Sequence, residues 1–128
     1  MDYNCFAWAL RDSTKCIDPD PMGIYSWPEG IQREYTLESF IELFRESGFE
    51  ECDNSSFEKG YEKVAIYLSD NGTPIHAARQ VEGGKWTSKL GDWEDIVHEL
   101  DGLEGTGLAY GQVAKILKRK ENLENLTA

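Results

Sequence analysis

The two residues with the clearest potential for chemistry are a cysteine at the start of the chain and a histidine near its middle. Cys5 opens a short apolar run that favours a helix, and His76 lies in a run of strand-forming residues. A lone cysteine is usually a packing residue. At the N-terminus of a helix, however, the backbone favours a thiolate, and an imidazole can accept the thiol proton. The pair therefore predicts a thiol nucleophile with its general base.

A third group is needed to orient the imidazole, and it is expected on the strand that follows His76. Across the next turn, the position that faces His76 falls near Thr87 or Ser88. We expect Ser88 to take the orienting role, and the carboxylate of Asp92 is the alternative. His98, the other histidine, is expected at the surface.

Two helices are expected before the sheet. Asn4 can cap a first helix that runs to about Asp12 and carries the cysteine in its first turn. The segment 18–30 holds three of the four prolines and is expected to be a loop. Thr36 predicts the start of a second, amphipathic helix, which Gly48 ends.

The middle of the chain predicts an antiparallel meander, because runs of β-branched and aromatic residues alternate with glycine-containing turn signals. The expected strands are 49–52, at an edge of the sheet, and then 63–68, 75–81 and 85–89. Residues 93–100 fit either a helical turn or an irregular strand. Residues 112–120 predict a C-terminal helix with a basic end that suits the helix dipole.

Length and charge restrict the class of protein. With 128 residues, the chain is expected to form a single domain over residues 1–128. A formal net charge of −11 argues against binding nucleic acid or an anionic membrane through bulk electrostatics. The sequence shows no secretory leader, membrane span or lipidation signal, so a cytoplasmic location is expected, with export by a machinery that needs no signal as the alternative.

The cysteines and histidines give little support for a metal or a disulfide. The three cysteines are an odd number, and no two of them form a Cys-x-x-Cys pair. A disulfide framework and a structural zinc site are therefore not expected. A metal site built from Cys5, His76 and His98 is a weak alternative, because no local ligand spacing supports it. We expect no metal and no cofactor.

Three blocks of sequence resemble small bacterial papain-like domains related to the NlpC-type cell-wall peptidases. The resemblance covers nearly the whole chain, and the blocks are residues 3–9, residues 35–40, and residues 76–80 followed by 86–91. It implies an α+β fold in which an N-terminal helix that carries the cysteine packs on an antiparallel meander. By the same resemblance, Cys5 is the nucleophile, His76 the base and Ser88, less securely, the orienting residue.

The oxyanion partner departs from the papain-like pattern. Papain-like peptidases usually place a glutamine several residues before the nucleophile, and here none of the four residues before Cys5 is a glutamine. The Cys5 N–H, with Asn4 or Tyr3, would then form the oxyanion hole. Aromatic residues near these positions are candidates to contact the substrate or, alternatively, to form a hydrophobic cover: Trp8, Tyr25, Trp27 and Trp86.

Two functions from different classes fit these observations. The first is a thiol hydrolase of the peptidase or amidase kind, or an acyl transferase, which attacks a peptide, amide or ester through an acyl-enzyme. The second is a catalytically weak or inactive papain-like scaffold that binds a basic protein partner through its net charge of −11. The geometry around the thiol and the imidazole decides between them.

Overall fold

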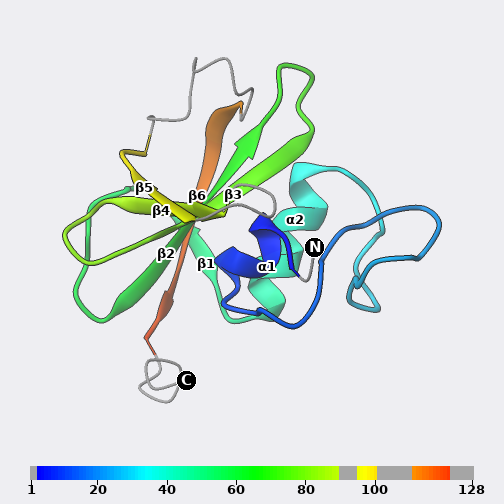
Figure 1. Ribbon diagram of the computed structural model, residues 1–128, viewed down its shortest axis with the longest axis horizontal. Helices are drawn as coiled ribbons and strands as arrows, with labels where there is room; N and C mark the ends of the chain where they lie inside the picture. Colours follow the sequence, from blue (N-terminus) through cyan, green and yellow to red (C-terminus); the bar gives the residue numbers. More distant parts are fainter. Residues whose placement is uncertain (1–2, 90–94, 101–110, 122–128) are drawn as a thin grey trace.

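An antiparallel sheet forms the centre of the computed structural model, which describes residues 3–89, 95–100 and 111–121 (Figure 1). The strand order is β1-β6-β2-β3-β4-β5. The strands are β1 (Glu50–Cys52), β2 (Tyr61–Leu68), β3 (Pro74–Gln80), β4 (Trp86–Lys89), β5 (Asp95–His98) and β6 (Gln112–Lys120). With α1 (Cys5–Ala9) and α2 (Leu37–Glu46), the fold belongs to the α+β class, as the sequence predicted.

Helix α1 is short, and both of its ends have a local cause. Its N-cap is Asn4, whose Oδ1 accepts a hydrogen bond from the Ala7 N–H at 3.1 Å. The helix ends before Leu10, and Arg11 then takes a left-handed conformation with φ of 61°. The predicted extension to Asp12 is therefore wrong. The helix packs against β3 and β4, which brings its first residue to the sheet.

Helix α2 agrees with the sequence prediction at both ends. The Thr36 side chain accepts a hydrogen bond from the Ser39 N–H at 3.2 Å, which caps the helix. Gly48, with φ of 95°, takes the left-handed conformation that commonly follows a helix. Phe40, Leu43 and Phe44 face the core, so the predicted amphipathic stripe is confirmed.

The predicted C-terminal helix is wrong, because residues 112–120 form the strand β6 between β1 and β2. The register of β6 against β2 shifts between its pairs with Ile66 and Tyr67, which leaves Ala114 without a partner position. This bulge places Val113 and Ile116 on the same face although they are three residues apart. A bulged strand thus reproduced the spacing that indicates a helix.

The basic residues of β6 consequently have no helix dipole to stabilise. They make ion pairs with acidic side chains of neighbouring segments instead. Lys115 lies 2.8 Å from Glu51, Lys118 lies 3.4 Å from Glu58, and Arg119 pairs with Glu62.

The other strands lie close to their predicted ranges. The edge strand β1 and the consecutive strands β2, β3 and β4 are confirmed. The segment 93–100 contributes a strand, β5, rather than a helical turn. Within the described ranges, no helix is long and apolar enough to cross a membrane.

The sheet separates two clusters of buried side chains. The helix-side cluster combines Phe6, Ala7 and Ala9 of α1 with the core residues of α2 and with Val64, Ile66, Ala77 and Leu117 of the sheet. The far-face cluster contains Ala65, Tyr67, Ala78 and Trp86. Because successive side chains of a strand point to opposite faces, the interior strands β2, β3 and β6 contribute to both clusters.

Candidate active site

Cys5 is the first residue of α1 and packs against the helix-side cluster, where it is half-buried. Backbone N–H groups of Ala77 in β3, of Phe6 and of Cys5 itself lie near the sulfur. They act to lower the pKa of the thiol, because N–H dipoles that face a sulfur stabilise its thiolate. The sulfur therefore lies against the β3 backbone at the residue that directly follows His76.

Burial outweighs these donors at the sulfur. The loss of solvent around Cys5 raises the pKa of its thiol to about 11, and the nearby Asp18 carboxylate acts in the same direction. The expectation that the start of the helix makes Cys5 a thiolate is therefore wrong for the resting protein. One short helix turn and three N–H donors do not compensate for the desolvation of the charged form.

His76 begins a hydrogen-bonded chain on the far face of the sheet. Its ring lies 5.4 Å from the ring of Tyr67, its register partner in β2. His76 Nε2 lies 2.9 Å from Ser88 Oγ, and Ser88 Oγ lies 2.6 Å from His98 Nε2. His98 Nδ1 in turn lies 2.6 Å from the carbonyl oxygen of Glu99. Three side chains from β3, β4 and β5 thus form one continuous polar chain.

The last contact sets the direction of the whole chain. A carbonyl oxygen only accepts, so His98 Nδ1 carries the proton that it donates to Glu99. In a neutral His98, Nε2 is then an acceptor, and it accepts a hydrogen bond from the Ser88 hydroxyl. Ser88 Oγ accepts in its turn from His76 Nε2–H. This leaves Nδ1 as the basic nitrogen of His76.

The His76 imidazole is held in its neutral form. Burial and the neighbouring His98 lower the pKa of His76 to about 4. The residue is 2% exposed, and Ser88 is fully buried. At neutral pH the imidazole of His76 in this hydrogen-bonded chain is therefore uncharged.

The structure brings Ser88 to His76, but not through the register that the sequence suggested. Thr87 pairs with Arg79, which places Ser88 diagonally across from His76 rather than opposite it. The two side chains still share the far face, because they are offset by an even number of positions. The hydroxyl reaches the imidazole along this diagonal.

Cys5 and His76 approach the same stretch of β3 from its two sides. Cys5 contacts the helix-side cluster, whereas the neighbours of His76 in the sheet, Tyr67 and Ser88, belong to the far face. What joins them is the β3 backbone at Ala77. The hydrogen bond described for the His76 ring leads to Ser88 and away from α1.

The Asn4 side chain is occupied by structural contacts. Its Oδ1 accepts from the N–H groups of Ala7 and Ile17, at 3.1 and 3.2 Å, and its Nδ2 donates to the Ile17 carbonyl at 2.7 Å. The Oδ1 and one of the two N–H groups of Nδ2 are thus used in contacts within the fold. The ring of Tyr3 lies under the ammonium of Lys89, with Nζ 4.6 Å from its centre.

The four aromatic candidates have four different environments. Trp86 is 1% exposed in the far-face cluster, so it is a core residue and does not line a cleft. Trp27 folds back on Phe40, with ring centroids 5.2 Å apart. The guanidinium of Arg79 covers Trp8 at 3.6 Å. Tyr25 is 47% exposed and lines a hollow next to Asn4.

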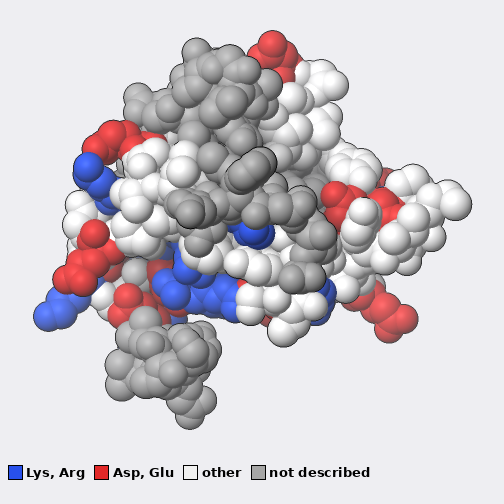
Figure 2. Space-filling view, in the orientation of Figure 1, with Lys and Arg blue, Asp and Glu red and all other residues white. Residues whose placement is uncertain are grey.

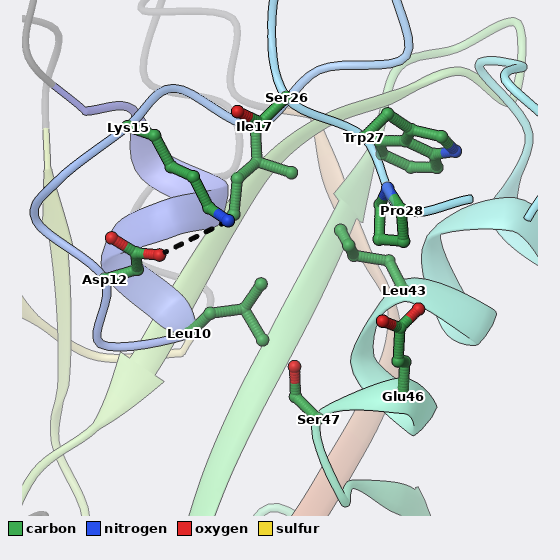
Figure 3. A pocket seen from close by; sticks show the side chains of 10 residues that line it. All are labelled: Leu10, Asp12, Lys15, Ile17, Ser26, Trp27, Pro28, Leu43, Glu46 and Ser47. Carbon is green, nitrogen blue, oxygen red and sulfur yellow. Dashed lines mark ion pairs between the residues drawn. The ribbon is translucent and has the colours of Figure 1, made fainter.

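One surface hollow lies away from both Cys5 and His76. About 450 Å³ in volume, it lies between the end of α1 and the end of α2, with Trp27 and Pro28 on one side and the ion pair of Asp12 and Lys15 on the other (Figure 3). Neither Cys5 nor His76 lines it. A smaller hollow of about 350 Å³ adjoins the start of α1 and has Asn4, Cys16, Asp18 and Tyr25 in its walls.

Two remaining predictions concern carboxylates and metals. Asp92, the alternative orienting residue, lies outside the described residues. Within the described part of the chain, no group of three or more His, Cys, Asp or Glu side chains could hold a metal ion.

His98 is the functional candidate that sequence reasoning missed. It was expected at the surface, but it is half-buried and bonded to Ser88. The signal that could have found it is its place in a strand after the meander, because Trp86 pairs with His98 and Ser88 with Ile96. Treating residues 93–100 as a strand would have placed His98 on the Ser88 face.

Comparison with known proteins gives one match. A family model described as "Domain of unknown function (DUF7689)" matches residues 1–118. No curated protein and no solved structure matches the chain.

Proposed function

We propose that this chain, which belongs to the family described as a domain of unknown function (DUF7689), is a cysteine-dependent hydrolase of amides or esters. The observation that carries the proposal is the chain from His76 through Ser88 to His98, which presents His76 Nδ1 as a base. The Cys5 sulfur lies against the backbone of the next residue, Ala77. A nucleophile, a base and an orienting group therefore occur around one segment of β3.

The reaction would begin from a neutral thiol and a neutral imidazole, because their pKa values are about 11 and about 4. As Cys5 Sγ bonds to the carbonyl carbon, the thiol proton would pass to His76 Nδ1, which requires α1 or β3 to move so that the two side chains come to the same side of the sheet. The same proton then goes to the leaving nitrogen or oxygen while its bond to carbon breaks. Water attacks the resulting thioester, gives one proton through His76 to the sulfur, and releases the acid.

We also propose that the fold is papain-like in the NlpC sense. The support is the order of elements: a helix that starts at the cysteine packs on an antiparallel sheet, and an interior strand of this sheet carries the histidine. The next strand contributes the polar residue that contacts it. This order agrees with the resemblance of the Cys5 and His76 segments to that superfamily.

The test is to trap the acyl-enzyme. The purified chain is mixed with 4-nitrophenyl acetate, quenched with acid, and analysed by intact mass and peptide mapping. We expect acetyl on Cys5 and a burst of nitrophenolate, both absent in Cys5→Ala. In His76→Gln, which keeps a donor for Ser88 but lacks the base, acylation is expected to slow by about 10²-fold or more.

The matched control is Cys52→Ala, which removes another half-buried thiol in β1, away from α1. It is expected to leave the burst unchanged. Acetylation that is spread equally over Cys5, Cys16 and Cys52, or a rate that His76→Gln does not change, would contradict the proposal. Thermal melts of each variant check that it is folded.

A second candidate function is the catalytically inactive scaffold that binds a basic protein. What favours it is the pair of pKa values, about 11 for Cys5 and about 4 for His76, because proton transfer between them is uphill in the resting protein. This candidate predicts no burst and a salt-sensitive affinity for lysine-rich peptides. Calorimetry at low and high salt measures that affinity.

A further inference from the structure

A hollow of about 350 Å³ beside the start of α1 has the features of a built pocket. Its described walls are Asn4, Cys16, Asp18 and Tyr25. Two of these wall residues are held to the segment that follows Tyr25, since the Asp18 N–H donates to the Ser26 carbonyl at 3.0 Å and the Ser26 N–H donates to the Cys16 carbonyl at 3.1 Å. Its volume lies within the range of small-molecule sites.

The same pocket is held in a fixed position next to the nucleophile. The side chain of Asn4 bonds both the N–H and the carbonyl of Ile17, which lies between Cys16 and Asp18. Asn4 also caps α1 through Ala7 and directly precedes Cys5 in the chain. A group bound in the pocket would therefore lie close to the Cys5 thiol.

The charge of the pocket comes from Asp18. Its carboxylate accepts a hydrogen bond from the Tyr35 hydroxyl at 2.5 Å, and this bond raises the pKa of Tyr35 to about 12, so the phenol stays neutral. Within residues 3–89, 95–100 and 111–121, no cation makes an ion pair with Asp18. Asp20, by contrast, is paired with Arg33 at 2.9 Å. Among the described residues, Asp18 thus keeps a negative charge that no ion pair compensates.

Tyr25 supplies the second element of recognition. It is 47% exposed, and its N–H is fixed by the Asp20 carboxylate at 3.0 Å. An aromatic ring beside a carboxylate suits an ammonium group, which gains an ion pair and a cation–π contact together. Acidic side chains also appear on the right of the view in Figure 2, over the segment between α1 and α2.

We infer that this pocket binds an alkylammonium group of the substrate, so that the chain acts on amides or esters of amine-bearing molecules. The inference rests on the proposed function, because it assigns the pocket to the substrate of Cys5. The ammonium can come from a lysine side chain or from a free α-amine. The two sources share the same chemistry and are separated by the choice of substrate.

The test compares three aminomethylcoumarin amides under identical conditions. They are the amides of N-acetyl-lysine, of N-acetyl-norleucine and of norleucine with a free α-amine. Norleucine matches the length of lysine without its charge. We expect kcat/KM for one of the two charged substrates to exceed that for N-acetyl-norleucine by about tenfold.

The preference is then traced to the pocket by substitution. Asp18→Asn keeps an acceptor for Tyr35 but removes the charge, and it is expected to reduce the ratio of charged to neutral turnover to near one. Tyr25→Leu is expected to reduce the ratio by a smaller factor. Asp53→Asn, an equal change of charge at an exposed turn residue, is the control and is expected to keep the ratio.

Failure of the inference and failure of the proposed function give different results. Turnover of all three amides at equal rates, or a preference that Asp18→Asn does not change, overturns the pocket assignment and leaves the hydrolase intact. If no amide is turned over, binding of N-acetyl-lysine amide is followed by NMR. Saturable shifts at Asp18 and Tyr25 that Asp18→Asn abolishes then support the pocket, and the absence of such shifts overturns it.

Discussion

The two faces of the sheet are made by the same strands but bury different side chains. The helix-covered face is filled by apolar side chains, among them Phe6, Phe40 and Ile66, and Cys5 packs at its margin. The far face buries polar groups, with Ser88 fully enclosed between His76 and His98. Because strand side chains alternate, a change at one residue affects only one of these environments.

The pKa values of the Cys5 thiol and the His76 imidazole shift in opposite directions, although burial acts on both groups. Each is desolvated, and desolvation favours the neutral form of each group. For Cys5 this raises the pKa, and for His76 it lowers the pKa. The helix-covered face therefore stores a protonated nucleophile, while the far face fixes a neutral base by hydrogen bonds. The following predictions test whether the two faces respond separately.

The largest effect is expected from emptying the helix-covered face. Phe40 is fully buried, with ring centroids 4.6 Å from Phe6 and 5.2 Å from Trp27. Phe40→Ala is expected to lower the free energy of unfolding by about 3–5 kcal/mol, because it creates a cavity that α2 cannot refill. Urea unfolding measures the loss. Phe57→Ala, at a residue that is 41% exposed, is the control, and an equal loss there would contradict this assignment.

The second prediction concerns acid stability and the far face. The folded pKa of His76 is about 4, below the unfolded value, so the unfolded chain binds more protons between the two values. Stability is thus fully present above about pH 6.5 and is lost as the pH falls toward 4, by roughly 3 kcal/mol in total. In His76→Gln this loss should be much smaller. Urea midpoints taken between pH 7 and pH 4 compare the two proteins, and parallel curves would refute the assignment.

Sequence reasoning found the elements whose signals are local. The cap at Thr36, the glycine at position 48 and the turn-separated strands each depend on a few neighbouring residues, and the structure has them. The strand β6 was missed because its bulge at Ala114 produces a helical spacing and because its partners are distant in the chain. Non-local pairing with β1 and β2 overrides the local pattern there.

In the candidate site, too, the residues with local signals were predicted and those that depend on distant contacts were not. The sequence identified Cys5, His76 and Ser88 as a group, and the contact of His76 with Ser88 follows from strands that turn on each other. His98 depended on a strand after the meander, which the pattern left ambiguous. The raised pKa of Cys5 could not be predicted, since desolvation depends on which distant residues cover the sulfur.

The smallest predicted effect measures how tightly the far-face chain is coupled. Ser88→Ala removes the hydroxyl that both imidazoles use, and it leaves two buried ring nitrogens without this partner. We expect a loss of about 1–3 kcal/mol in the free energy of unfolding. Ser39→Ala removes a buried serine hydroxyl from α2 on the other face and is expected to cost less, because alanine favours a helix.

A double-mutant cycle then tests whether the two hydrogen bonds of Ser88, to His76 and to His98, depend on each other. If His98 acts on His76 through Ser88, the losses in Ser88→Ala and His98→Ala should not add in the double variant, and the coupling should be about 1 kcal/mol. Additive losses would mean that the serine holds the two histidines independently. In that case the carbonyl of Glu99 would fix the tautomer of His98 but not that of His76. The Nδ1 atom of His76 would then not be held as the unprotonated, basic nitrogen.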